Sequence, residues 1–247
     1  MKPKVVQTMD IVRFLSAIHA LRTRDVDEGG FAVVFGHTGV GKTTAQLFGA
    51  NLADVHYLVA RDSWTVRRMM VDFADVLGIQ RHWGADDGVV AAMERLSADP
   101  RPVFIDEADF VLKKMPLFHA LRSIYDRTQV PVVLALSREG AKRLGSGKRY
   151  DRHRRRVSQW IEFRGITKPE ADLLVAERVE VGIDPELARR AFDASRGNTA
   201  AFVESCRDME KFAASNGLEQ VTPEEWGDRP FRRPGPHGFY PAGQEWD

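Results

Sequence analysis

This chain of 247 residues lacks the features that mark secreted and membrane proteins. Its single cysteine, Cys206, excludes an internal disulfide and is typical of a reducing compartment. No segment approaches the roughly 18–20 apolar residues that cross a bilayer, and the first ten residues lack the apolar run of a signal peptide. The histidines and the cysteine show no metal-ligand spacing. We therefore expect a cytoplasmic protein that does not enter a membrane. The net charge of +1 does not by itself indicate a particular class of partner.

Short apolar runs alternate with amphipathic stretches over the first two thirds of the chain. The predicted strands are residues 31–35, 55–60, 102–105, 130–136 and 159–163. The predicted helices are residues 8–24, 42–53, 64–77, 87–97 and 117–127. This alternation predicts an α/β fold with three layers, in which helices cover both faces of a mostly parallel sheet. Ligands of such sheets bind beyond the carboxyl ends of the strands.

The pattern changes after Pro169, where three helices are predicted at residues 169–181, 185–194 and 198–214. We expect an N-terminal helix within residues 1–30, a nucleotide-binding core at 31–165, a helical lid at 166–216 and a tail rich in proline and glycine at 217–247. The tail is expected to be ordered only where it docks. Its aromatic residues could anchor a partner or be incidental; they are Trp226, Phe231, Phe239, Tyr240 and Trp246.

The run from Gly36 to Thr43 has the pattern G-x-x-x-x-G-K-T, between a predicted strand and a predicted helix. The glycines let backbone N–H groups approach phosphates, and the helix that follows points its positive end at them. Lys42 is expected to reach the β- and γ-phosphates of ATP, and the Thr43 hydroxyl is expected to bind Mg²⁺. The predicted nucleotide-binding residues are Gly36, His37, Thr38, Gly39, Val40, Gly41, Lys42, Thr43 and Thr44.

Two acidic residues end the third predicted strand. Asp106 is expected to hold Mg²⁺, directly or through water, and Glu107 is expected to polarise the water that attacks ATP. Ser137 ends the fourth strand, where it could contact the γ-phosphate or could simply cap the next helix. Together with the phosphate loop, the acidic pair predicts an ATPase.

A basic segment follows Ser137. Its cations include Arg138, Lys142, Arg143, Lys148, Arg149, Arg152, Arg154, Arg155 and Arg156. One of these arginines could act as a finger on the ATP of a neighbouring subunit, and the three consecutive arginines before Val157 favour this role, although spacing does not indicate which arginine it is. The others, together with the pairs Arg67–Arg68 and Lys113–Lys114, could contact DNA phosphates. A solvated basic surface is the alternative for all of them.

The order of these motifs resembles that of AAA+ ATPases of the transposition type, which include the B protein of bacteriophage Mu and the TniB and TnsC-like proteins. The resemblance covers residues 8–215 and rests on the phosphate loop, on Val103–Asp109, on the helix leading into Val130–Leu136, on the arginine cluster and on the helical lid. It implies ATP bound between subunits, a homo-oligomeric filament or ring on duplex DNA, recruitment of a transposase, and disassembly on hydrolysis. It also implies a first-sensor position at Ser137 and a finger position near Arg155 or Arg156.

Two features depart from that family. Only about 35 residues precede the phosphate loop, so any DNA binding is expected from the core itself. The turn at Ser195–Ala201 has alanines where a second-sensor arginine would fall, which leaves Arg196 as a substitute or the sensor missing. Two alternatives stay open: an ATPase acting on a protein partner, similar to ExeA-type secretion ATPases, and a nucleotide-gated binding module with little turnover.

Overall fold

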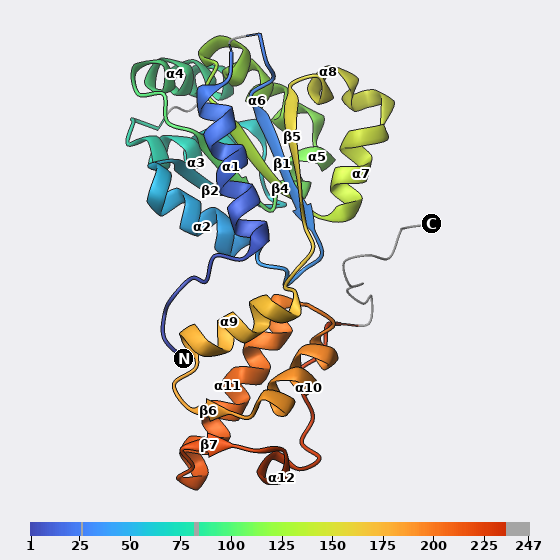
Figure 1. Ribbon diagram of the computed structural model, residues 1–247. Helices are drawn as coiled ribbons and strands as arrows, with labels where there is room; N and C mark the ends of the chain where they lie inside the picture. The colour runs from blue at the N-terminus through green and yellow to red at the C-terminus, as the bar shows by residue number, and fades with distance from the viewer. Residues whose placement is uncertain (26, 82–83, 236–247) are drawn as a thin grey trace. The chain divides into compact units, whose positions relative to one another are not determined.

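The computed structural model describes residues 1–25, 27–81 and 84–235. Its main sheet has the strand order β2-β3-β4-β1-β5 (Figure 1). The strands are β1 (Phe31–Gly36), β2 (His56–Val59), β3 (Val103–Asp106), β4 (Val132–Leu136) and β5 (Val157–Phe163). Strand β4 pairs in parallel with β1 and β3, and β3 pairs in parallel with β2. The five predicted strands and the α/β fold are confirmed.

The central strands are buried because helices cover both faces of the sheet. On one face Phe104 of β3 makes an edge-on contact with Phe14, and on the other Phe31 of β1 contacts Phe118 and Tyr125. The helices of this part are α1 (Met9–Thr23), α2 (Lys42–Ala53), α3 (Val66–Leu77), α4 (Ala85–Ala98), α5 (Asp109–Lys113), α6 (Met115–Thr128), α7 (Arg138–Ser146) and α8 (Asp151–Arg154). A 3₁₀ turn, η1, covers Lys148–Tyr150. An apolar strand buried on both faces is typical of such layered sheets.

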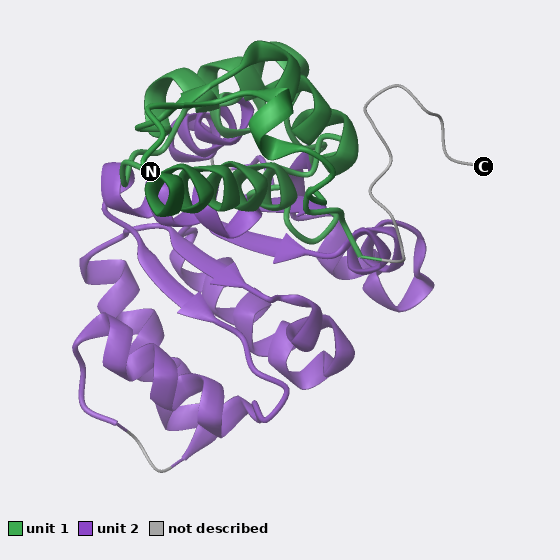
Figure 2. Ribbon diagram, turned by 90° about the horizontal axis from the view of Figure 1, so that it is seen from below, with its two compact units in different colours: residues 1–12, 37–41, 163–247 green, residues 13–36, 42–162 purple. Residues whose placement is uncertain are grey.

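The chain forms two compact units (Figure 2). The larger contains residues 13–36 and 42–162, and the smaller contains residues 1–12, 37–41 and 163–247. The smaller unit holds α9 (Lys168–Arg178), α10 (Pro185–Ser195), α11 (Thr199–Asn216) and α12 (Pro223–Trp226). Two short parallel strands, β6 (Gly182–Ile183) and β7 (Gln220–Val221), complete it.

Part of the expected tail is packed into the smaller unit. Trp226 is 3% exposed, stacks on Phe231 and meets Phe212 edge-on. Thr222 and Glu225 form a capping box that starts α12, a signal present in the sequence. Trp226 is therefore a core residue and not an exposed anchor for a partner. Phe239, Tyr240 and Trp246 lie outside the described residues.

Within the described ranges, none of the helices is long and apolar enough to cross a membrane.

Candidate nucleotide-binding site

The predicted phosphate loop joins the end of β1 to the start of α2. Gly39 and Gly41 have φ angles of +83° and +98°, which residues with a Cβ rarely adopt. A Cβ on Gly41 would meet nothing within 4 Å, whereas one on Gly39 would lie 2.7 Å from Asn198 Oδ1. Gly41 is thus required by its backbone conformation alone, and Gly39 also by the closeness of a neighbouring side chain.

Asn198 holds the backbone of this loop. Its Nδ2 donates to the Thr38 carbonyl oxygen across 2.9 Å, and its Oδ1 accepts from Ala201 N across 3.0 Å. The bond from Ala201 N caps α11. Nearby, the N–H of Ala200 donates to the Gly39 carbonyl across 2.9 Å. The start of α11 and the loop therefore share one side chain. The sequence marked Asn198 only as part of a turn.

Lys42 starts α2 with its ammonium group directed at the loop. Its Nζ donates to the Gly36 carbonyl oxygen across 2.8 Å. Burial lowers the pKa of Lys42, and the nearby carboxylates of Asp106, Glu107 and Asp109 oppose that effect. A partly buried ammonium beside such acids is suited to pair with the phosphates of a nucleotide.

Thr43 and Asp106 meet at the position expected for a magnesium ion. The Thr43 Oγ1 donates to Asp106 Oδ2 across 2.8 Å, and Asp106 is only 5% exposed. Both groups offer hard oxygen ligands, which Mg²⁺ prefers. A protein-bound Mg²⁺ usually keeps several waters and also binds nucleotide phosphates. The residues therefore fit a Mg²⁺ ion that arrives with ATP. Thr44 and His37 lie next to this site in the chain, and their predicted contacts with nucleotide stay predictions.

Glu107 adopts an unusual backbone conformation. Its φ angle is +52°, and its N–H donates to Asp106 Oδ1 across 2.9 Å. A non-glycine residue in this region carries strain of roughly 1 kcal/mol or more, which the surrounding structure has to support. Glu107 is exposed and directly follows β3, and its predicted role in activating water stays a prediction.

Ser137 caps α7, as one of the two sequence interpretations predicted. Its Oγ accepts from Gly140 N across 3.0 Å and donates to Asp109 Oδ1 across 2.6 Å. Asp109 Oδ2 also accepts from Ser137 N across 2.7 Å. The acidic turn after β3 is thereby joined to the end of β4, a link that the sequence did not indicate because Asp109 and Ser137 are 28 residues apart. A contact between Ser137 and the γ-phosphate stays a prediction.

Residues 24–144 match a family model described as an AAA domain. The chain carries an AAA-type P-loop ATPase domain. ATP and Mg²⁺ are the ligands of such a domain, and ATP hydrolysis is its reaction. No curated protein matches the chain at a significant level.

Solved structures share the fold of most of this chain. The Aeropyrum pernix ORC2 protein in ADPNP–ADP complexes has a TM-score of 0.69 and 15% identity, over 91% of this chain and 68% of that one. The Aeropyrum pernix ORC1 protein in complex with DNA has a TM-score of 0.65 and 18% identity, over 90% and 64%. The Thermotoga maritima RuvB Holliday junction branch migration motor has a TM-score of 0.60 and 17% identity, over 89% and 67%. The chain thus spans about two thirds of each neighbour's length.

The two candidate finger arginines have different surroundings in the larger unit. Arg156 forms a two-pronged ion pair with Asp126, with distances of 2.5 Å from Nε and 2.8 Å from Nη2. Arg155 is exposed, and its side chain makes no ion pair with a described residue. Arg155 is therefore the better candidate to reach a neighbouring subunit.

The predicted DNA-binding cations fall into two groups. In the first group the cation contacts other residues of the larger unit: Arg68 forms an ion pair with Asp72, Lys114 donates to the Trp64 carbonyl, and Arg149 donates to the Leu112 carbonyl. Arg67 and Lys113 are exposed, and Lys113 also lies over the Phe110 ring. The second group is exposed on α7, η1 and α8 without an ion pair to any residue described; its members are Lys142, Arg143, Lys148 and Arg152.

A second-sensor arginine is not found at the start of α11. Arg196 ends α10 with a φ of +50° and is exposed, two residues before the Asn198 cap. The first turn of α11 contains Thr199, Ala200 and Ala201 and no cation. Of the two interpretations left open by the sequence, a missing second sensor agrees with this first turn, and a substitute role for Arg196 stays a prediction.

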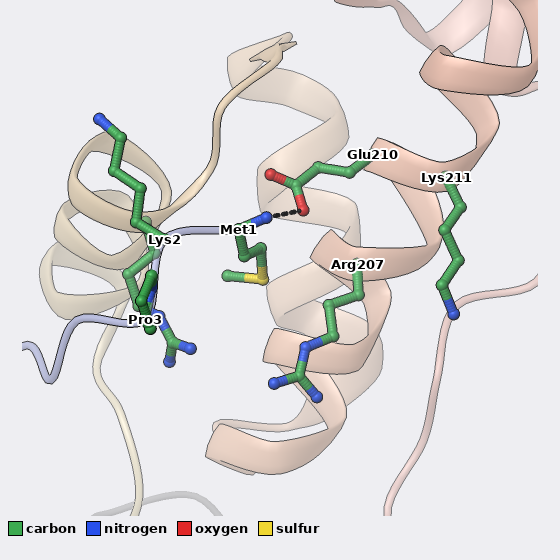
Figure 3. A pocket seen from close by; sticks show the side chains of 7 residues that line it. Met1, Lys2, Pro3, Arg207, Glu210 and Lys211 are labelled. Carbon is green, nitrogen blue, oxygen red and sulfur yellow. Dashed lines mark hydrogen bonds and ion pairs between the residues drawn. The ribbon is translucent and has the colours of Figure 1, made fainter.

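A separate pocket of about 490 Å³ lies in the smaller unit (Figure 3). Its lining is rich in cations, and the Met1 ammonium group donates a hydrogen bond to Glu210 Oε2 across 2.7 Å. The lining residues are Met1, Lys2, Pro3, Arg178, Arg207, Glu210 and Lys211. None of them belongs to the predicted nucleotide site.

Proposed function

We propose that this protein is an ATP-dependent, sequence-nonspecific DNA-binding AAA+ protein that forms homo-oligomers on duplex DNA and recruits a transposase. The observation that carries the proposal is the exposed group of four cations on α7, η1 and α8, in the same compact unit as Lys42, Thr43 and Asp106. ATP hydrolysis controls release from DNA. We also propose that the protein is cytoplasmic, as expected from the sequence.

The geometry of the ATP site supports the following proposed roles for its residues. The backbone of residues 36–41 and the ammonium of Lys42 bind the phosphates, and Thr43 with Asp106 holds Mg²⁺. Glu107 orients the attacking water from its exposed position at the end of β3. Ser137 senses the γ-phosphate through its junction with Asp109.

Assembly would complete this site. Transition-state charge on the phosphates is commonly stabilised by an arginine supplied in trans. Arg155 is exposed on the surface that follows α8, and the adjacent Arg156 is fixed by Asp126. We assign Arg155 as the residue that contacts ATP on a neighbouring copy, so that nucleotide binding and oligomerisation support each other.

The four exposed cations would contact DNA backbone phosphates. Such contacts do not depend on base sequence and weaken as salt rises. One neighbour in fold is an ORC1 protein in complex with DNA, which makes DNA a reasonable ligand for this architecture. The transposase as partner comes from the resemblance of the motif order to transposition ATPases.

Fluorescence anisotropy of a labelled DNA duplex tests the DNA part of the proposal. With a non-hydrolysable ATP analogue, wild-type protein should bind duplexes of unrelated sequence with similar affinity, and with ADP it should bind weakly. Replacing Lys142, Arg143, Lys148 and Arg152 by serine should lower the slope of log affinity against log salt by up to about 3.6, at roughly 0.9 per phosphate contact.

A matched control removes cations elsewhere. Arg189 and Arg190 are exposed on α10 and pair with Asp193 and Glu186, so their replacement by serine should leave the slope unchanged. If the quadruple variant keeps the wild-type slope, these cations do not bind DNA. ATPase activity that is insensitive to DNA would favour the alternative of an ATPase acting on a protein partner.

A further inference from the structure

The edge strand β2 supplies a hydroxyl group to the acid of the magnesium site. Tyr57 on β2 is in register with Phe104 of β3, and Asp106 lies two residues further along β3. Since side chains two apart on a strand share a face, Tyr57 and Asp106 lie on the same face of the sheet. The Tyr57 hydroxyl donates to Asp106 Oδ2 across 3.0 Å.

This hydroxyl uses one of the few acceptor positions on the carboxylate. An ionised aspartate offers about four lone-pair positions. Oδ2 of Asp106 accepts from Thr43 Oγ1 at 2.8 Å and from Tyr57 at 3.0 Å, and Oδ1 accepts from Glu107 N at 2.9 Å. With respect to the described residues, one position on Oδ1 is left to meet the cation or a water bound to it.

We propose that Tyr57 is a positioning residue for magnesium: its hydroxyl fixes the plane of the Asp106 carboxylate and leaves a position on Oδ1 that would bind the ion or one of its waters. The three donors come from α2, β2 and the backbone after β3, so three separate parts of the larger unit hold the carboxylate.

The burial of Asp106 agrees with this role. Only 5% of the residue is exposed, so water cannot readily replace a lost donor. The role concerns the ATP site alone and does not depend on the proposed DNA function.

The variant Tyr57→Phe removes the hydroxyl and keeps the ring. The matched control is Tyr125→Phe, which removes a tyrosine hydroxyl that donates to the Glu28 carbonyl across 3.3 Å in the same unit. Equilibrium binding of a fluorescent ATP analogue is measured in EDTA and then across a Mg²⁺ titration, with thermal unfolding recorded for each protein. This readout does not depend on turnover.

Tyr57→Phe should bind the analogue in EDTA within about twofold of wild type, because Tyr57 contacts the acid and not the nucleotide. Its half-saturating Mg²⁺ concentration should rise about tenfold, equivalent to about 1.4 kcal/mol. Tyr125→Phe should match wild type in both measurements. ATPase activity of Tyr57→Phe should recover at high Mg²⁺.

The proposal is overturned if the Mg²⁺ titration of Tyr57→Phe overlays that of wild type, or if Tyr125→Phe shifts it equally. It is also overturned if binding in EDTA falls as much as binding in Mg²⁺, since that result indicates a general structural role. If Tyr57→Phe does not fold, Tyr57→Met serves as the hydroxyl-free variant, and the same shift of the Mg²⁺ titration is expected.

Discussion

Replacing Asn198 with alanine should weaken both the smaller unit and its hold on the phosphate loop. Asn198 makes two side-chain hydrogen bonds, one to Ala201 N that caps α11 and one to the Thr38 carbonyl. Alanine cannot make either bond. The residue is 4% exposed, so water has little access to the groups left unpaired.

The size of the effect follows from these two bonds. Loss of an asparagine helix cap costs about 1 kcal/mol, and loss of a neutral hydrogen bond to a carbonyl costs about another 1 kcal/mol. We therefore expect Asn198→Ala to lose about 2 kcal/mol of unfolding free energy. Without the bond to Thr38, ATP binding would have to order the phosphate loop. ATP affinity should therefore fall by roughly threefold to tenfold, which corresponds to about 0.7–1.4 kcal/mol of binding free energy.

Asp184→Ala is the matched control in the same unit. Asp184 caps α10 by accepting from Glu186 N across 2.8 Å, and neither the phosphate loop nor α11 takes part in that bond. Its replacement should cost about 1 kcal/mol and leave ATP affinity unchanged. Urea unfolding measures the stability of both variants, and titration with a fluorescent ATP analogue measures their affinity.

The reasoning fails if the two variants behave alike. Equal losses of stability would mean that the bond from Asn198 to Thr38 contributes nothing. Unchanged ATP affinity in Asn198→Ala, with stability reduced as expected, would mean that this bond does not organise the loop for nucleotide.

Three further outcomes are expected. Glu107→Gln should abolish ATP turnover in a phosphate-release assay while ATP binding stays within about twofold of wild type; unchanged turnover would remove Glu107 from its role and leave the interpretation as a binding module open. Gly140→Ala would place a Cβ 2.1 Å from Asp109 Oδ1, and it should lower the free energy of unfolding in urea by about 2–3 kcal/mol. The control Gly145→Ala should be neutral or slightly stabilising, because its Cβ would meet only the Trp160 ring at 3.8 Å. Burial, and then nearby positive groups, lower the pKa of His153 to about 4, so the folded state favours neutral histidine and up to about 3 kcal/mol should be lost as pH falls from about 6.5 to 4. His153→Phe should reduce that loss, and an identical pH profile in the variant would refute the assignment.

The elements and the chemistry of the phosphate loop could be predicted from the sequence because their signals are local. Gly36–Thr43 lies between an apolar strand and a helix, and Asp106 ends another apolar strand. Parallel topology then brings the carboxyl ends of these strands together, which places Thr43 within 2.8 Å of Asp106 although 63 residues separate them. Only the approximate location, and not the hydrogen bonds, follows from that rule.

Residues that support the site from a distance could not be predicted. Tyr57 is an ordinary strand residue until β2 pairs with β3, and the sequence marks Asn198 only as part of a turn, with no sign of its bond to Thr38. The charge cluster after Ser137 likewise gave no way to separate Arg156, which Asp126 holds, from the exposed Arg155. In each case a side chain acquires its role from a partner far away in the chain.

The most direct test of the central claim is negative-stain electron microscopy of the wild-type protein with duplex DNA. The claim predicts filaments or rings on DNA in the presence of a non-hydrolysable ATP analogue, and dispersed protein when ADP replaces the analogue. Dispersed protein in both conditions, at concentrations where the ATP analogue is bound, would contradict it.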